Sequence, residues 1–240
     1  MQNEPKEGAE FDRHADEYRA MHARNVASYG EGPEYFAEYK VIETARLVRR
    51  RGLSGELRAL DFGSGIGNAV PHFAKHLPQA RLTCADVSER SLHLSAESFP
   101  GLATHSRIEG DRLDFDDGAF DIVFTACVFH HIAHEDHAAI LRELHRVLAP
   151  GGVFVVFEHN PWNPLTVRAV KDCPFDENAV LIPPPTLADR VRAAGFDDVS
   201  TRYRLFFPGF LAALRGMEPM LGLVPMGAQY FVTGTRHAGV

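Results

Sequence analysis

The chain has 240 residues, a hydrophobic content of 45% and a formal net charge of −7 at pH 7. These values suit one large domain with a sizeable core, and the acidic balance disfavours a protein whose whole surface grips nucleic acid. Its three cysteines are widely spaced and match no disulfide framework or zinc pattern, which favours a cytoplasmic location. No secretory signal is expected in residues 1–10. No run of about 18 apolar residues occurs, so no membrane span is predicted.

Strand-like and helix-like segments alternate along most of the chain. Helices are predicted at 11–30, 34–50, 69–77, 88–98, 136–148 and 186–194. Strands are predicted at 58–62, 81–86, 103–108, 120–127, 152–158, 197–206 and 229–235. Thr186 is the expected cap of its helix, and Pro150-Gly151-Gly152 is the expected turn before a strand. This order predicts an α/β fold with a mostly parallel, doubly wound sheet covered on both faces.

A glycine-rich loop, Asp61-Phe62-Gly63-Ser64-Gly65-Ile66-Gly67-Asn68, joins a predicted strand to a predicted helix. Glycines let the backbone approach a nucleoside, and the start of the helix offers unpaired N–H groups. The glycines follow the pattern G-x-G-x-G, whereas a dinucleotide cradle has G-x-G-x-x-G. The loop therefore predicts a nucleoside ligand without phosphates, and a NAD-dependent oxidoreductase remains only a remote alternative.

Two acidic positions follow the loop. Asp86 ends a predicted strand roughly 20 residues beyond Gly67, where an acid accepts hydrogen bonds from ribose hydroxyls. A second acidic stretch runs from Glu109 through Asp111 and Arg112 to Val123. With the glycine loop, these stretches resemble the class I S-adenosylmethionine-dependent methyltransferases of the small-molecule, ubiquinone/menaquinone-methyltransferase-like type. The resemblance is strongest over residues 40–160.

The resemblance implies a Rossmann-like sheet of seven strands with an antiparallel last strand, and S-adenosyl-L-methionine as cofactor. It divides one domain into a helical lid at 1–50, a cofactor-binding core at 51–160 and an acceptor-side part at 161–240. The loop would lie beneath the methionine part of the cofactor, and Asp86 and Asp111 would hold the ribose and the adenine. The implied cofactor-binding residues are Tyr18, Asp61, Gly63, Ser64, Gly65, Gly67, Asn68, Asp86, Val87, Asp111, Arg112 and Cys127.

The acceptor should lie where two strands end beside the cofactor, at His130-His131 and at Glu158-His159. A neutral imidazole accepts protons near pH 7, so His131, or else His130, is a candidate base, and Glu158 is a second candidate catalytic residue. The alternative is that the histidines only shape the cofactor pocket. Adjacent strand residues point to opposite faces, so only one of Glu158 and His159 is expected in the pocket. Trp162 either stacks on the acceptor or plugs a proline-rich turn.

Histidines recur every third residue at His131, His134 and His137, but the pattern is not H-E-x-x-H and no metal site is predicted. The segment 205–228 is unusually apolar. It could wall an apolar acceptor pocket, form a dimer face, rest on a membrane surface or pack into the core.

The sequence as a whole predicts a methyltransferase that acts on a small molecule by in-line displacement, with O- or C-methylation favoured. An RNA or protein methyltransferase and a non-catalytic S-adenosylmethionine-binding protein remain as alternatives. No nucleic-acid partner is expected, and the oligomeric state, monomer or homodimer, stays open.

Overall fold

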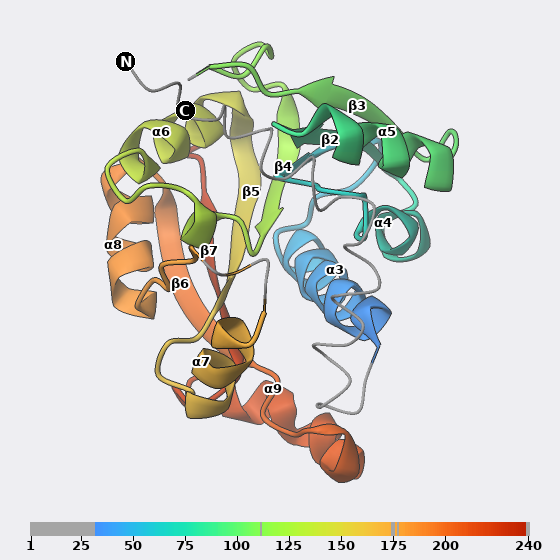
Figure 1. The fold of residues 1–240 in the computed structure, drawn as a ribbon. Coiled ribbons are helices and arrows are strands. Elements are labelled where there is room, and N and C mark those ends of the chain that lie inside the picture. Colours follow the sequence, from blue (N-terminus) through green and yellow to red (C-terminus); the bar gives the residue numbers. More distant parts are fainter. Residues whose placement is uncertain (1–31, 111, 174–175, 177, 239–240) are drawn as a thin grey trace, which may run out of the picture.

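The computed structural model describes residues 32–238 except 111, 174, 175 and 177. Its strands form one seven-stranded sheet in the order β3-β2-β1-β4-β5-β7-β6 (Figure 1). The strands are β1 (Leu57–Phe62), β2 (Ala80–Asp86), β3 (Ala103–Arg107), β4 (Phe120–Ala126), β5 (Leu148–His159), β6 (Asp197–Arg204) and β7 (Gln229–Thr235). Neighbouring strands from β3 to β5 pair in parallel, while β7 pairs antiparallel with both β5 and β6. The predicted doubly wound sheet with an antiparallel last strand is confirmed.

Helices cover both faces of this sheet (Figure 1). They are α3 (Pro33–Arg50), α4 (Val70–His76), α5 (Glu89–Ser98), α6 (His137–Val147), α7 (Pro164–Lys171), α8 (Pro184–Ala193) and α9 (Glu218–Leu221), with 3-10 segments η2 (Phe129–His131) and η4 (Gly209–Met217). The helix predicted at 11–30 lies outside the described residues. Among the described helices, none is both long and apolar enough to cross a bilayer.

Two predicted boundaries are wrong. Thr186 lies inside α8, which begins at Pro184 after Pro183, because proline at the first helical position already has a helical φ and needs no N–H partner. The Pro150-Gly151-Gly152 segment does not precede β5 but lies within it, where the register with β4 shifts between Phe120 and Ile122. Gly151 has φ of 78°, which accommodates this bulge.

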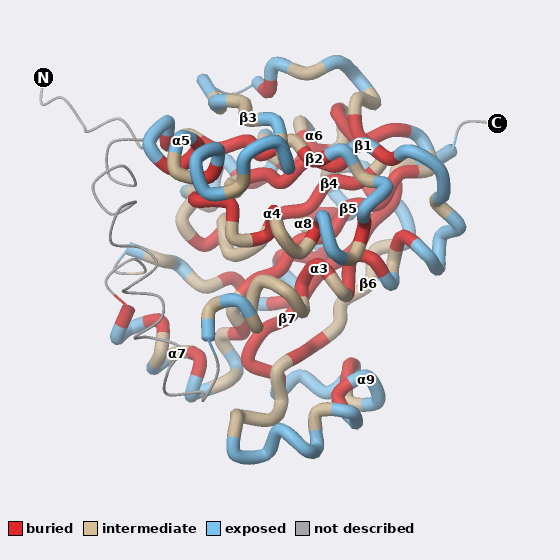
Figure 2. Tube along the Cα trace, turned by 90° about the vertical axis from the view of Figure 1, so that its right-hand side faces the viewer, coloured by how far each residue is buried: buried red, intermediate tan, exposed pale blue. Residues whose placement is uncertain are grey.

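Two hydrophobic clusters occupy the two faces of the sheet, and buried residues follow the strands in Figure 2. Side chains alternate between them along β1, where Leu60 joins one cluster and Ala59 the other. Leu141 and Leu144 of α6 are completely buried in the first cluster, and each contributes about 1.5–3 kcal/mol by leaving water. The rigid sheet therefore holds the loops at its edge in fixed positions.

A buried ion pair fastens α3 to the end of β6. Both carboxylate oxygens of Glu43 accept hydrogen bonds from the guanidinium of Arg204, from Nε at 3.1 Å and from Nη2 at 2.9 Å. The two residues are 4% and 9% exposed. The pair connects segments that are 161 positions apart in the chain and helps to hold α3 on the face of the sheet that carries its buried residues Val41, Ala45 and Val48.

Candidate cofactor and acceptor site

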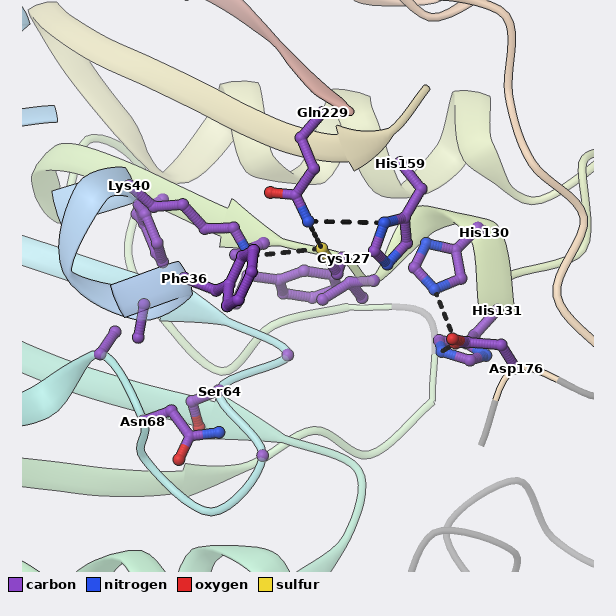
Figure 3. A pocket seen from close by; sticks show the side chains of 18 of the residues that line it. Phe36, Lys40, Ser64, Asn68, Cys127, His130, His131, His159, Asp176 and Gln229 are labelled. Carbon is purple, nitrogen blue, oxygen red and sulfur yellow. Dashed lines mark hydrogen bonds and ion pairs between the residues drawn. The ribbon is translucent and has the colours of Figure 1, made fainter. Parts of the chain in front are cut away.

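A cavity of about 750 Å³ lies at the carboxyl ends of the parallel strands. The loops after β1, β2, β4 and β5 line it, together with α3, α7 and residues 205–208. Figure 3 shows some of the lining side chains, among them Lys40, Ser64 and His131. Its volume falls within the range of roughly 300–1,000 Å³ found for small-molecule pockets, and its place is where open α/β sheets bind ligands.

The glycine loop after β1 forms one wall of the cavity. Gly63 and Gly65 have φ of 71° and 52°, which side chains rarely adopt. A Cβ on Gly65 would meet no described atom within 4 Å, so this residue faces open space in the cavity. A Cβ on Gly63 would lie 2.4 Å from Cγ2 of Val128, so the absence of a side chain lets the loop after β4 approach closely. The loop can therefore cradle a ligand beside the end of β4.

Asp86 is held rigidly at the end of β2. Its Oδ2 accepts a hydrogen bond from the backbone N–H of Gly65 at 2.7 Å, and its Oδ1 accepts one from Ser88 at 2.9 Å. Ser88 in turn caps α5 by accepting from the N–H of Ser91 at 3.0 Å. The carboxylate lines the cavity, and because each of its oxygens can accept more than one hydrogen bond, the donors of a ligand can bind it there.

On the acceptor side, four side chains meet at the ends of β4 and β5. Nδ1 of His130 lies 2.5 Å from Oε2 of Glu158, and Oδ1 of Asp176 lies 3.4 Å from Nε2 of both His130 and His131. Glu158 also accepts from the backbone N–H groups of Val128 (3.2 Å) and Phe129 (2.9 Å). His130, His131 and Asp176 line the cavity.

Residues 60–154 match the family model of a methyltransferase domain. The chain is 26% identical over 200 residues to the ubiquinone/menaquinone biosynthesis C-methyltransferase UbiE of Pseudomonas putida (strain GB-1), covering 72% of this chain and 77% of that protein. It is 36% identical over 107 residues to the demethylmenaquinone methyltransferase of Thermus thermophilus, covering 43% of this chain and about half (48%) of that protein. The chain is a class I S-adenosylmethionine-dependent methyltransferase.

Solved structures share the fold of this methyltransferase. A Thermotoga maritima S-adenosylmethionine-dependent methyltransferase has a TM-score of 0.64 at 19% identity and covers 95% of this chain and 99% of its own. The phosphoethanolamine N-methyltransferase 2 of Haemonchus contortus, in complex with S-adenosylmethionine, has a TM-score of 0.67 at 15% identity. This match covers 98% of this chain and 61% of that protein. The open face of Gly65 beside the acid Asp86 fits this cofactor, which has a ribose and no phosphate.

Most residues predicted to bind the cofactor of this methyltransferase do line the cavity: Asp61, Gly63, Ser64, Gly65, Asn68, Asp86, Val87 and Cys127. Gly67 and Arg112 are not among the described lining residues, so direct cofactor contact from them is not supported. Gly67 instead lets α5 pack closely, because a Cβ there would lie 2.2 Å from Oγ of Ser95, and Arg112 points to solvent. Tyr18 and Asp111 lie outside the described residues.

The expectation that Glu158 acts on the acceptor is wrong, because its side chain is completely buried and is not among the described residues that line the cavity. Its carboxylate positions His130 and the loop after β4. His159, which alternates with Glu158 along β5, reaches the cavity instead. Trp162 is 45% exposed and is likewise absent from the described lining, so neither role expected for it is supported.

Sequence reasoning missed Lys40, Asp176 and Gln229 in the methyltransferase cavity. Figure 3 shows Cys127 between Lys40 and Gln229, with Nζ of Lys40 at 3.4 Å and Nε2 of Gln229 at 3.7 Å from its sulfur. Burial alone would raise the pKa of Cys127, but Lys40 and His159 outweigh it and lower the pKa to about 7. No local sequence pattern around Cys127 predicts Lys40 and Gln229 as its partners, because they come from a helix and a strand far away in the chain. Ile108 and Leu113 also line the cavity.

The apolar segment 205–228 has two parts. Leu205 to Pro208 line the cavity, as the acceptor-pocket alternative requires. The core-packing alternative is wrong for most of the rest, since Phe210 is 86%, Met220 83% and Leu223 73% exposed. Buried Glu218 holds the segment in place by accepting from the backbone N–H groups of residues 205–207.

Proposed function

We propose that this methyltransferase acts on an oxygen or an activated carbon of a small, largely apolar acceptor that carries an ionisable hydroxyl. The observation that carries the proposal is that one cavity joins the glycine loop to an apolar wall and a polar end. The apolar wall comes from Phe206, Phe207 and Val170, and the polar end from His131 and Asp176. S-adenosylmethionine supplies an electrophilic methyl group, and the cavity can hold an acceptor atom in line with it.

The arrangement supports specific roles on the cofactor side. Asp86 is proposed to accept hydrogen bonds from the ribose hydroxyls, and Val87, Ile108 and Leu113 to pack around the adenine. The backbone of Gly63 and Gly65 is proposed to lie beneath the methionine part. All of these residues line the cavity.

On the acceptor side, His131 is proposed to contact the reacting hydroxyl. Its side chain is 19% exposed, lines the cavity and lies 3.4 Å from Oδ1 of Asp176. If His131 acts on the transferred proton, His131→Ala should lower kcat by about 10²–10⁴-fold. The affinity for S-adenosylhomocysteine should stay unchanged, since that ligand lacks the acceptor.

The relatives support a small acceptor, because one is named for C-methylation in ubiquinone/menaquinone biosynthesis and another is named a demethylmenaquinone methyltransferase. An RNA or protein acceptor would require a broad, accessible groove, and the net charge of −7 disfavours RNA. A non-catalytic role would leave cofactor binding intact without methyl transfer.

A direct test combines calorimetry with a methyl-transfer assay. The full chain should bind S-adenosylhomocysteine and not NAD. With labelled S-adenosylmethionine it should methylate hydroxylated quinols or phenols with apolar substituents in preference to bulk tRNA or protein. Methylation of tRNA or protein alone would overturn the small-molecule assignment, and cofactor binding without transfer to any acceptor in the panel would favour the non-catalytic alternative.

Cofactor affinity should depend on the protonation of Asp61. Burial, and after it the neighbouring Asp86 carboxylate, raises the pKa of Asp61 to about 8. The cationic cofactor favours the ionised carboxylate, so binding below that pH requires loss of a proton. The Kd for S-adenosylmethionine should therefore fall by up to about tenfold per pH unit as the pH rises towards 8, and then level off. Calorimetry across this range checks it, and Asp61→Asn should flatten the profile.

Cys127 should be more reactive than Cys84 near neutral pH. Its lowered pKa provides thiolate at pH 7, whereas burial raises the pKa of Cys84 and leaves it protonated. Iodoacetamide should label Cys127 before Cys84, more slowly below pH 7, and S-adenosylhomocysteine should protect Cys127. Peptide mass mapping against a Cys127→Ser control checks this order, and earlier labelling of Cys84 would contradict it.

A further inference from the structure

The polar end of the cavity has the geometry of a metal-ligand set. One ring nitrogen of His130, one ring nitrogen of His131 and a carboxylate oxygen of Asp176 lie within 4.8 Å of one another. We propose that these three side chains bind a divalent transition-metal ion that holds the acceptor through its hydroxyl. This inference rests on the proposed function for the identity of the acceptor, but the ion site itself stands on geometry. It departs from the sequence-based expectation of no metal, and it does not use His134 or His137.

The spacing of the ligand atoms suits an ion better than a hydrogen bond. Oδ1 of Asp176 lies 3.4 Å from Nε2 of both His130 and His131. This is longer than the roughly 2.7–3.2 Å of an N–H···O hydrogen bond. Two ligand atoms that each lie about 2.1 Å from an ion, at a tetrahedral angle, are about 3.4 Å apart. The structure therefore already separates these atoms as a tetrahedral ion would.

An outer carboxylate orients His130 for this task. Glu158 faces Nδ1 of His130 at 2.5 Å, and the N–H groups of Val128 and Phe129 fix the carboxylate in turn. A metal-binding histidine commonly donates its other ring N–H to a carboxylate, which leaves the ligating nitrogen with its lone pair directed at the ion. Here that arrangement directs Nε2 of His130 towards Asp176 and the cavity. The role of orienting His130 also accounts for the burial of Glu158, which is 0% exposed.

The donor set defines the class of ion. Two imidazoles and one carboxylate suit zinc or ferrous iron, whereas magnesium and calcium prefer oxygen ligands alone. Three protein ligands leave at least one position for a hydroxyl of the acceptor, whose pKa the ion lowers. With an ion bound, His131 would serve as a ligand, and the ion would act as a Lewis acid, so that the acceptor hydroxyl releases its proton to solvent without a general base. The metal keeps its oxidation state because methyl transfer involves no redox change.

The competing arrangement is a proton in place of the ion. In that case His130 is an imidazolium between Glu158 and Asp176, and the cluster only stiffens the loop after β4. The two arrangements differ in one measurable respect. An ion site binds a metal with one-to-one stoichiometry and depends on Asp176 and His131, whereas a protonated His130 shows no saturable metal binding.

Metal titration of the full chain, freed of metal with a chelator, tests the proposal. Wild-type protein should bind one equivalent of Co²⁺ with the visible absorption of a tetrahedral site, and Zn²⁺ should displace it. Asp176→Asn and His131→Ala should each weaken binding by more than about 100-fold, beyond the effect expected for outer-shell changes. Glu158→Gln should weaken it by about 10–100-fold.

Asp172→Asn is the matched control, because Asp172 is exposed on the same segment and pairs only loosely with Arg168 at 3.7 Å. It should leave metal affinity unchanged. Each variant is compared only when its S-adenosylhomocysteine affinity matches the wild type, which shows that it is folded. Absence of saturable Co²⁺ binding, or binding that both Asp176→Asn and His131→Ala leave intact, would overturn the ion site. Metal binding without methyl transfer to any small acceptor would overturn the proposed function instead.

Discussion

Replacing Asp86 with alanine is expected to weaken S-adenosylhomocysteine binding by about 2–3 kcal/mol, or roughly 30–150-fold in Kd. The proposed cause is the loss of charged hydrogen bonds to the ribose hydroxyls. The same carboxylate accepts from the N–H groups of Gly65 at 2.7 Å and Ser88 at 2.9 Å. The substitution therefore also removes the partner that fixes the glycine loop, and both losses act in the same direction. Calorimetric titration of the variant measures the change.

Asp86→Asn separates the two contributions. It keeps an acceptor for a backbone N–H but removes the charge, so its loss of affinity should lie between those of wild type and Asp86→Ala. Arg112→Ala is the matched control, since Arg112 is exposed and lies outside the described cavity lining. An unchanged Kd in Asp86→Ala would show that the ribose lies elsewhere.

Replacing Glu43 with alanine is expected to lower the free energy of unfolding by about 3–5 kcal/mol. The substitution leaves the guanidinium of Arg204, 9% exposed, without its carboxylate partner inside the protein. For a chain of this length, the loss corresponds to a fall in Tm of roughly 6–20 °C. Urea unfolding followed by circular dichroism measures it.

Glu38→Ala provides the control from the same helix. Glu38 pairs with Lys75 at 2.7 Å in a more exposed setting, so its loss should cost less than about 1 kcal/mol. Glu43→Leu combined with Arg204→Met removes both buried charges and should recover much of the lost stability. Equal effects of Glu43→Ala and Glu38→Ala would contradict the assignment of a buried pair.

The strands were predictable because each one carries its own signal. Short apolar runs bounded by turn residues mark β1, β2 and β4. Such runs are typical of parallel strands that are buried on both faces of the sheet. The boundaries of strands were less predictable where they depend on pairing with a neighbouring strand. The Pro150-Gly151 segment reads as a turn, yet pairing with β4 recruits it into β5 as a bulge.

The two halves of the site differ in the same way. The cofactor side rests on one loop and one strand end. The spacing of the glycines and the acid in the sequence is therefore enough to indicate a cofactor site. The acceptor side combines residues from α3, η2, β5, β7 and the segment after α7, so neighbours in space are far apart in the chain. Sequence reasoning thus placed Glu158 in the pocket, whereas the alternation of side chains along β5 buries Glu158 and directs His159 to the cavity.

The sequence by itself determined the order of the elements, the glycine loop and its acid, and through them the methyl donor. Local geometry suffices for this, because a strand, a turn and a helix position the backbone that meets the cofactor. Only the tertiary structure decided that Glu158 supports His130, that Asp176 faces both histidines, and that Lys40 and Gln229 surround Cys127. Those relations depend on how distant segments pack, which no local spacing in the chain encodes.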